Sequence, residues 1–67
     1  MNWDQVEGNW KQVRGKVKQQ WAKLTDDDLA LIDGKRLELV GKIQERHGIT
    51  KEQAEKQLHD FTDRLEL

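Results

Sequence analysis

The sequence predicts an all-α fold, a small four-helix bundle, from three observations. The 67 residues contain no proline. Lys, Glu, Gln, Leu and Arg, which favour helix, are far more common than β-branched residues. Apolar residues recur at intervals of three and four, the spacing that places them on one side of a helix. We expect a single domain, residues 1–67, with a thin core, because a chain of this length buries only about 60% of the surface exposed by its unfolded form.

A long first helix is predicted from the start of the chain to about residue 24. Asn2 with Gln5 three residues later fits a capped helix start. Each large aromatic ring can bury more apolar surface than most other side chains. We therefore expect the three indoles to face inward and to supply much of the core. The predicted apolar stripe consists of Trp3, Val6, Trp10, Val13, Val17, Trp21 and Leu24.

A short second helix is expected after Thr25, which is followed by three aspartates, residues 26–28. The threonine hydroxyl can accept a hydrogen bond from a free backbone N–H, and carboxylates suit the positive end of the helix dipole. Leu29 and Ile32 should face inward. Gly34 should end the helix after about Asp33.

The third helix is predicted from about Lys35 to His47, with cations in its last turn and Gly48 just beyond its end. Its expected inward side consists of Leu37, Val40, Ile43 and His47.

The fourth helix should begin at Thr50, which can form a capping box with Gln53, while Ile49 packs on Ala54. Its inward side consists of Ala54, Leu58, Phe61 and Leu65. Three glycines, Gly8, Gly15 and Gly41, fall off the apolar stripes. They are either tolerated residues, parts of a second contact surface, or a means of keeping the helices loose.

Composition excludes several classes of function. Twelve Lys or Arg balance thirteen Asp or Glu, and cysteine is absent. The chain therefore lacks a global field for nucleic acid or membrane, and it fits a reducing cytosol. Without a signal-peptide or membrane-spanning segment, we expect a soluble cytoplasmic protein, with a monomer favoured.

Catalysis is not expected, because serine, cysteine and tyrosine are absent and the only hydroxyls are Thr25, Thr50 and Thr62. No cofactor or metal site is predicted. The aspartate triplet does not fit a calcium loop, since Ala30 and Leu31 stand where a ligand and a glycine are needed. His59 with Asp63 one turn later is interpreted as a solvated surface pair, and His47 as a partly buried residue that ends its helix.

One local feature favours a polyanion. Lys11, Arg14 and Lys18 are spaced along one side of the first helix, and Lys16 and Lys23 lie on its other flank. Residues 1–24 hold five basic side chains against two acidic ones. Weak contact with nucleic acid or an anionic surface is one hypothesis. The alternative is a solvated surface beside a buried stripe, as is usual for such charges.

The chain also resembles a known family along nearly its whole length. The motifs that carry the resemblance are Gly8-Asn9-Trp10-Lys11-Gln12, Gly15-Lys16-Val17-Lys18, Lys23-Leu24-Thr25-Asp26-Asp27-Asp28, Gly34-Lys35, Leu39-Val40-Gly41-Lys42-Ile43-Gln44-Glu45-Arg46 and Gly48. In this order they are similar to the CsbD-like family of small bacterial proteins, and within it to the YjbJ-type members.

The resemblance implies a cytosolic bacterial protein of the general stress response, with two helical hairpins packed roughly crosswise. It brings no ligand, reaction or catalytic residue. Two positions depart from the family pattern: Ala22, where glycine is frequent, and His47, where tyrosine is common. The leading hypothesis is a non-enzymatic stress-response protein that acts by binding or by bulk protective presence. The alternative is a small nucleic-acid-binding module that uses the basic flank of the first helix.

Overall fold

The computed structural model describes residues 3–65, and all their regular secondary structure is helical. The helices are α1 (Trp3–Gly8), α2 (Trp10–Gln20), α3 (Asp26–Ile32), α4 (Arg36–His47) and α5 (Lys51–Arg64). The all-α prediction is therefore confirmed. The predicted number of four helices is wrong, since the described residues form five.

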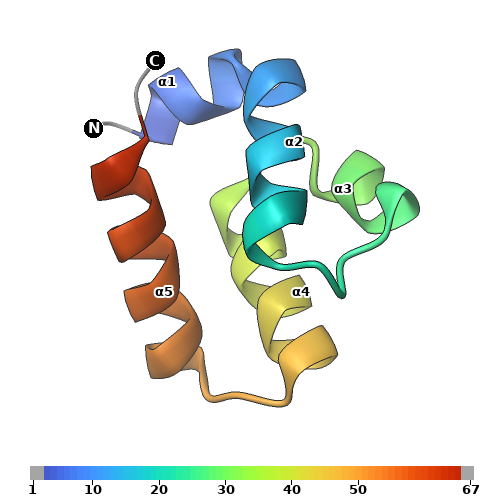
Figure 1. Ribbon diagram of the computed structural model, residues 1–67, viewed down its shortest axis with the longest axis vertical. Coiled ribbons are helices and arrows are strands. Elements are labelled where there is room, and N and C mark those ends of the chain that lie inside the picture. The colour runs from blue at the N-terminus through green and yellow to red at the C-terminus, as the bar shows by residue number, and fades with distance from the viewer. Residues whose placement is uncertain (1–2, 66–67) are drawn as a thin grey trace.

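The additional helix arises because the predicted long first helix is broken at Asn9. The side-chain amide of Asn9 donates a hydrogen bond to the carbonyl oxygen of Gln5 at 2.8 Å. The backbone N–H of Asn9 also donates to Gln5 O, at 3.1 Å, and to Val6 O, at 3.2 Å. An asparagine side chain that competes for backbone groups favours a turn over a continued helix. The chain therefore bends sharply between α1 and α2 (Figure 1).

The second error concerns the end of this segment. Helix α2 ends at Gln20, so Trp21 and Leu24 lie in the turn that follows it. Both are nevertheless buried, which explains why the apolar spacing extends past the helix. The proposed cap at Asn2 lies outside the described residues.

The helices enclose one apolar core. Helices α4 and α5 run antiparallel, joined by a short turn, and α3 packs beside α4 (Figure 1). Helix α1 crosses one end of the molecule. The crosswise arrangement of two hairpins stays a prediction. The buried apolar residues are Val6, Trp10, Val13, Val17, Trp21, Leu24, Leu29, Ile32, Leu39, Val40, Ile43, Ala54, Leu58 and Leu65.

All three indoles turn inward, as predicted, and each N–H finds an acceptor in another part of the chain. Trp3 is partly buried and donates to Gly34 O at 2.7 Å. Trp10 donates to Leu29 O at 3.2 Å, and Trp21 donates to Gln57 Oε1 at 2.9 Å. A buried polar group without a partner is costly. These bonds therefore favour one alignment of the segments that carry the tryptophans against α3, the turn after it and α5.

The expected inward side of α4 is wrong at one residue. Leu37 is 71% exposed, whereas Leu39 is fully buried. Successive residues are about 100° apart around a helix, so three residues fall about 60° short of a full turn. Residues spaced only by threes therefore move steadily around the helix instead of staying on one side. Leu39, Val40 and Ile43 lie closer together around the helix than Leu37 and Ile43 do. The other predicted inward residues of α4 are buried or, at His47, partly buried.

The predicted helix ends are confirmed where local chemistry determines them. Thr25 and Asp28 form a capping box at the start of α3, and Thr50 and Gln53 form another at the start of α5. Helix α4 ends at His47, and the following residue, Gly48, has a left-handed φ of 63° that suits glycine. Local hydrogen bonds decide these boundaries, so sequence alone is enough to find them.

Three glycines have room for a side chain. A Cβ added at Gly8, Gly15 or Gly41 would meet no atom within 4 Å, as expected for positions away from the core. In the interior of a helix, alanine is about 0.5–1 kcal/mol more favourable than glycine. We expect Gly15→Ala and Gly41→Ala each to raise the free energy of unfolding by that amount, as measured by urea denaturation.

Gly34 is the matched control for this prediction. Its φ is 79°, and a Cβ there would lie 3.1 Å from the Cα of Glu7. Gly34→Ala should therefore lower the stability of the protein. If alanine at Gly15 and Gly41 also destabilised the protein, the assignment of these two positions to open helix surface would be contradicted.

Candidate polyanion-binding face

The structure brings three of the four predicted basic residues together. Lys11, Arg14 and Lys18 line a shallow groove of about 450 Å³ between α2 and α3. Gly15 leaves the middle of this groove without a side chain, and Leu29 lies on the α3 side. Lys23 is exposed in the turn after α2 and does not line the groove. We call Lys11, Arg14 and Lys18 the basic face.

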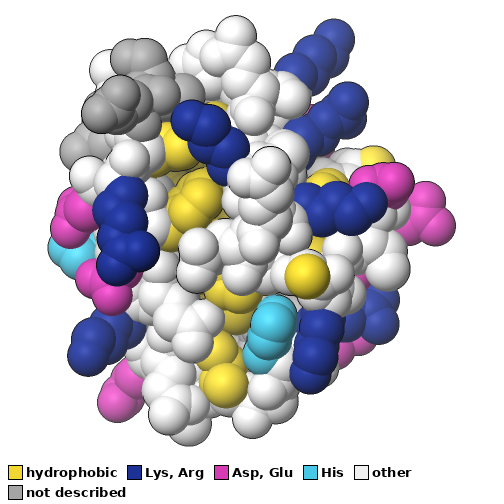
Figure 2. Space-filling view, in the orientation of Figure 1, with side chains coloured by type: hydrophobic (Ala, Val, Ile, Leu, Met, Phe, Trp, Pro, Cys, Tyr) yellow, Lys and Arg dark blue, Asp and Glu magenta, His cyan; other side chains and the backbone are white. Residues whose placement is uncertain are grey.

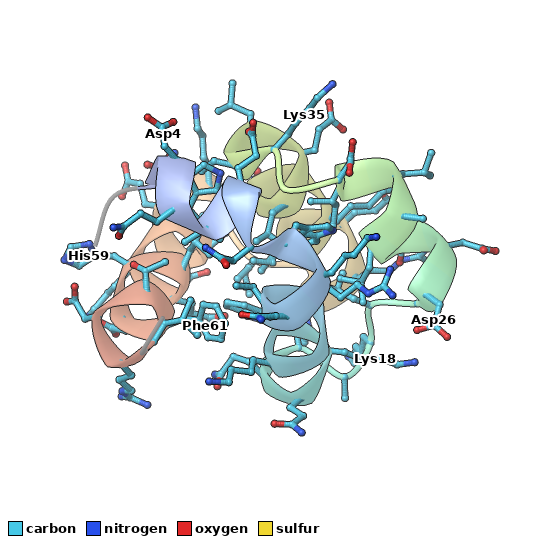
Figure 3. The ribbon with its side chains drawn as sticks, turned by 90° about the horizontal axis from the view of Figure 1, so that it is seen from above. Asp4, Lys18, Asp26, Lys35, His59 and Phe61 are labelled. Carbon is cyan, nitrogen blue, oxygen red and sulfur yellow. The ribbon has the colours of Figure 1, made fainter. Side chains whose placement is uncertain are left out.

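One cation of the basic face is already paired. Lys18 Nζ lies 2.7 Å from Asp26 Oδ1, in the first turn of α3 (Figure 3). The hydrogen bond and the charge of Lys18, with a smaller effect of Arg14, hold the pKa of Asp26 below its usual value. Among the described residues, Lys11 and Arg14 make no ion pair. The groove therefore carries two unpaired cations and one neutralised one.

The sequence interpretation missed the pairing of Lys18 because Asp26 was assigned only to helix capping. Asp26 lies eight residues after Lys18, beyond the spacing at which two residues of one helix meet. Only the turn between α2 and α3 brings their side chains together. In the space-filling view, dark blue side chains lie beside magenta ones at the α3 side of the molecule (Figure 2).

Asp28 has a different role from its two neighbours. It is the one charged side chain that is buried among residues 3–65, with 2% exposed. Its carboxylate accepts two hydrogen bonds from Arg46, at 2.9 and 3.0 Å, and one from the backbone N–H of Thr25 at 3.0 Å. Lys42 Nζ lies 3.7 Å away. The hydrogen bonds from Arg46 and then from Thr25 hold the pKa of Asp28 far below its usual value.

This cluster connects α3 to α4. A bidentate contact between arginine and carboxylate fixes both distance and orientation, and the same carboxylate caps α3. The sequence predicted the cap but not the partner, since Arg46 was assigned to the C-terminal end of the dipole of α4. No local pattern pairs residues that are 18 positions apart.

Neither histidine forms part of a reactive cluster. His59 Nε2 lies 3.3 Å from Asp63 Oδ2, and both side chains are more than half exposed, which confirms the surface pair. His47 ends α4 and is partly buried, also as predicted. Its Nε2 is buried without a hydrogen-bond partner. Among residues 3–65, no three His, Asp or Glu side chains are grouped as metal ligands would be.

The three hydroxyl groups all make local hydrogen bonds. Those of Thr25 and Thr50 accept from backbone N–H groups in their capping boxes, as predicted. Thr62 donates to the carbonyl oxygen of His59 at 2.9 Å. In the described part of the chain, no helix combines the length and apolar character needed to cross a membrane.

Comparison with known proteins decides the family. The model of the CsbD-like family matches residues 4–56. This chain belongs to the CsbD-like family. The matched residues include α1 from Asp4 onward, α2 to α4, the whole basic face and both ends of the Asp28–Arg46 contact.

Bacterial relatives in the CsbD-like family are similar over nearly the full chain. The UPF0337 protein YjbJ of Escherichia coli K12 is 62% identical over 66 residues, which is 98% of this chain and 96% of the relative. A UPF0337 protein of Pectobacterium atrosepticum is 62% identical over 63 residues, 94% of this chain and 91% of the relative. A UPF0337 protein of Pseudomonas aeruginosa is 55% identical over 65 residues, 97% of this chain and the whole relative.

Membership in the CsbD-like family confirms the resemblance drawn from the motifs. Neither departure from its pattern disturbs the core. Ala22 is exposed in the turn after α2, and His47 lies at the exposed end of α4 with part of its ring covered.

Proposed function

We propose that this CsbD-like protein is a cytoplasmic, non-enzymatic component of the general stress response. It acts through binding or through protective presence in bulk. The observation that carries the proposal is the separation of its side chains: a closed apolar core, and a surface that bears every charged residue of positions 3–65 except Asp28. A surface dense in charged side chains stays hydrated, because removing a charge from water is costly.

Protection of a labile enzyme during heating or drying tests this proposal. Purified protein should preserve enzyme activity better than an equal mass of an unrelated helical protein of the same size. Bulk protection should rise steadily with protein concentration, whereas specific binding should saturate at a fixed molar ratio. Protection no better than that of the control protein, together with unchanged survival of a stressed deletion strain, would refute the proposal.

Enzymatic activity is the alternative that this proposal excludes, and it can be tested separately. A substrate or metal that binds the native state raises the melting temperature in proportion to the logarithm of its concentration. We expect no metal ion to raise the melting temperature and no common metabolite to be converted by the protein. Conversion of any bound compound would contradict this part of the proposal.

The second candidate function is binding of nucleic acid, which is favoured by the unpaired Lys11 and Arg14 on the basic face. With about two phosphate contacts, one from each unpaired cation, raising the salt concentration from about 50 to about 200 mM should weaken binding about 7- to 12-fold. Lys11→Gln with Arg14→Gln should reduce both the affinity and this salt dependence. Fluorescence anisotropy with a labelled oligonucleotide measures both quantities.

The matched control is Lys35→Gln with Lys56→Gln, which removes two exposed cations outside the basic face. The control variant should retain the greater part of the binding. Equal losses in the two variants would show a response to net charge alone. The absence of salt-sensitive binding at about 50 mM salt would exclude this function.

A further inference from the structure

A second groove lies on the opposite side of α2 from the basic face. It is formed by the C-terminal halves of α2 and α5 and has a volume of about 380 Å³. Phe61 lies between these two helices (Figure 3). The volume falls at the lower end of the range found for small-molecule sites. This groove has no role in the function proposed above.

The floor of the groove is apolar and leads directly into the core. Phe61 is partly buried and Leu65 is 7% exposed. The ring of Phe61 lies 5.1 Å from that of Trp21, at an interplanar angle of 57°. Trp21 itself is 1% exposed. A ligand in contact with Phe61 therefore lies one ring away from a buried indole.

The walls of the groove carry polar groups with free hydrogen-bonding capacity. Lys16 and Gln20 belong to α2, and Gln57 and Arg64 belong to α5. Among the described residues, Lys16 and Arg64 make neither an ion pair nor a side-chain hydrogen bond. Gln57 uses its carbonyl oxygen for the indole of Trp21, so its NH₂ group remains available.

The charges of the lining favour an anion. Two cations, one on each wall, outnumber the single carboxylate of Asp60. In the space-filling view, hydrophobic side chains are visible in the hollow between α2 and α5, with Lys or Arg side chains on both sides of it (Figure 2). Cations on facing walls above an apolar floor complement a molecule with one acidic group and one apolar body.

We propose that this groove binds a small organic carboxylate with an aromatic or branched aliphatic body. The body lies on Phe61, and the carboxylate accepts hydrogen bonds from Lys16 and Arg64. A polyanion fits less well, because the apolar floor offers nothing to a second phosphate. For a ligand of about ten non-hydrogen atoms in an open groove, the expected dissociation constant is on the order of 1 mM.

Phenylacetate is the probe, and its neutral amide, phenylacetamide, is the matched ligand control. NMR titration to about 10 mM, ten times the expected constant, follows the three indole N–H signals separately. We expect phenylacetate to shift the Trp21 signal and the side-chain amide signals of Gln57, with the Trp10 signal unchanged. Phenylacetamide loses the charge contacts with both Lys16 and Arg64, so it should bind more weakly, by up to about fivefold.

Variants test the two cations directly. Lys16→Gln with Arg64→Gln should weaken phenylacetate binding at least fivefold, an order-of-magnitude expectation for exposed charges. Lys11→Gln with Arg14→Gln, which alters only the basic face, should leave binding unchanged. Asp60→Asn should strengthen binding about two- to fivefold by removing the opposing carboxylate. All these side chains lie at the surface, so circular dichroism should show unchanged folding.

Three results would overturn the proposal. The first is no shift of the Trp21 signal at about 10 mM phenylacetate. The second is an equal response to phenylacetamide, which would show apolar contact without recognition of the anion. The third is a larger loss in the Lys11 and Arg14 variant than in the Lys16 and Arg64 variant. None of these outcomes depends on nucleic-acid binding or stress protection, so the two proposals can fail independently.

Discussion

Trp21→Ala is expected to remove a large share of the stability of the protein. Trp21 is 1% exposed, contacts Phe61 and donates its indole N–H to Gln57. Replacing a buried tryptophan by alanine costs about 3–5 kcal/mol. Domains of this length have a total stability of about 3–10 kcal/mol, from 0.05–0.15 kcal/mol per residue. The substitution therefore removes a large share of the free energy of unfolding.

Urea denaturation followed by far-ultraviolet circular dichroism measures this effect without relying on tryptophan fluorescence. The matched control is Leu37→Ala, which shortens a large apolar side chain that is 71% exposed. It should change the free energy of unfolding by less than about 0.5 kcal/mol. A loss below about 1 kcal/mol in Trp21→Ala would show that the core does not depend on this indole.

Asp28→Asn is expected to have the second-largest effect, although it only replaces one carboxylate oxygen by an NH₂ group. The amide keeps the shape of the carboxylate but has no negative charge. It also has only one oxygen to accept the two hydrogen bonds of Arg46. Removing one partner of a buried ion pair leaves the other partner poorly compensated. We expect the melting temperature to fall by roughly 10 °C or more, with α3 detached from α4.

A double-mutant cycle separates this contact from the capping role of Asp28. Arg46→Gln removes only the ion pair, and the combined variant should lose less stability than the sum of the two single variants. The exposed pair Lys18 and Asp26 provides the control, because Asp26→Asn should have a small effect. If the effects of Asp28→Asn and Arg46→Gln were additive, the contact between α3 and α4 would carry no coupling energy.

The same contact predicts a dependence of stability on pH. Its hydrogen bonds hold the pKa of Asp28 below the usual 3.8, so the unfolded chain takes up a proton at a higher pH than the folded one. The stabilisation by ionised Asp28 is therefore complete above about pH 5 and is lost as the pH falls through 4 towards the lower, folded value. Thermal melts at several pH values should show a smaller loss below pH 4 in Asp28→Asn. Equal pH profiles would contradict the assignment.

Much of the candidate basic face could be found from sequence, because Lys11, Arg14 and Lys18 recur at the spacing of one helix side. Its actual charge could not, since the carboxylate that neutralises Lys18 comes from another helix. The groove between α2 and α5 could hardly be predicted from the sequence. Phe61 and Arg64 are three residues apart on α5, but their partner Lys16 is more than forty positions away.

The break at Asn9 shows a different kind of limit. The pair Gly8-Asn9 is a turn signal in the sequence, yet the apolar spacing continues through it without interruption. Both a straight helix and a bent one can bury Val6, Trp10 and Val13, so periodicity does not distinguish them. The local hydrogen bonds of Asn9 favour the bend, and the hydrogen bond of Trp3 to Gly34 holds α1 in its bent position.

By itself, the sequence determined the helical class, the capped starts at Thr25 and Thr50, the glycine end at Gly48 and the inward tryptophans. These features depend on hydrogen bonds within a few residues or on the strong preference of large apolar side chains for burial. The tertiary structure alone decided the burial of Leu39 in place of Leu37, and the partners of Asp28, Lys18 and the three indoles. Each of these depends on groups that are distant in sequence and meet only when the helices pack.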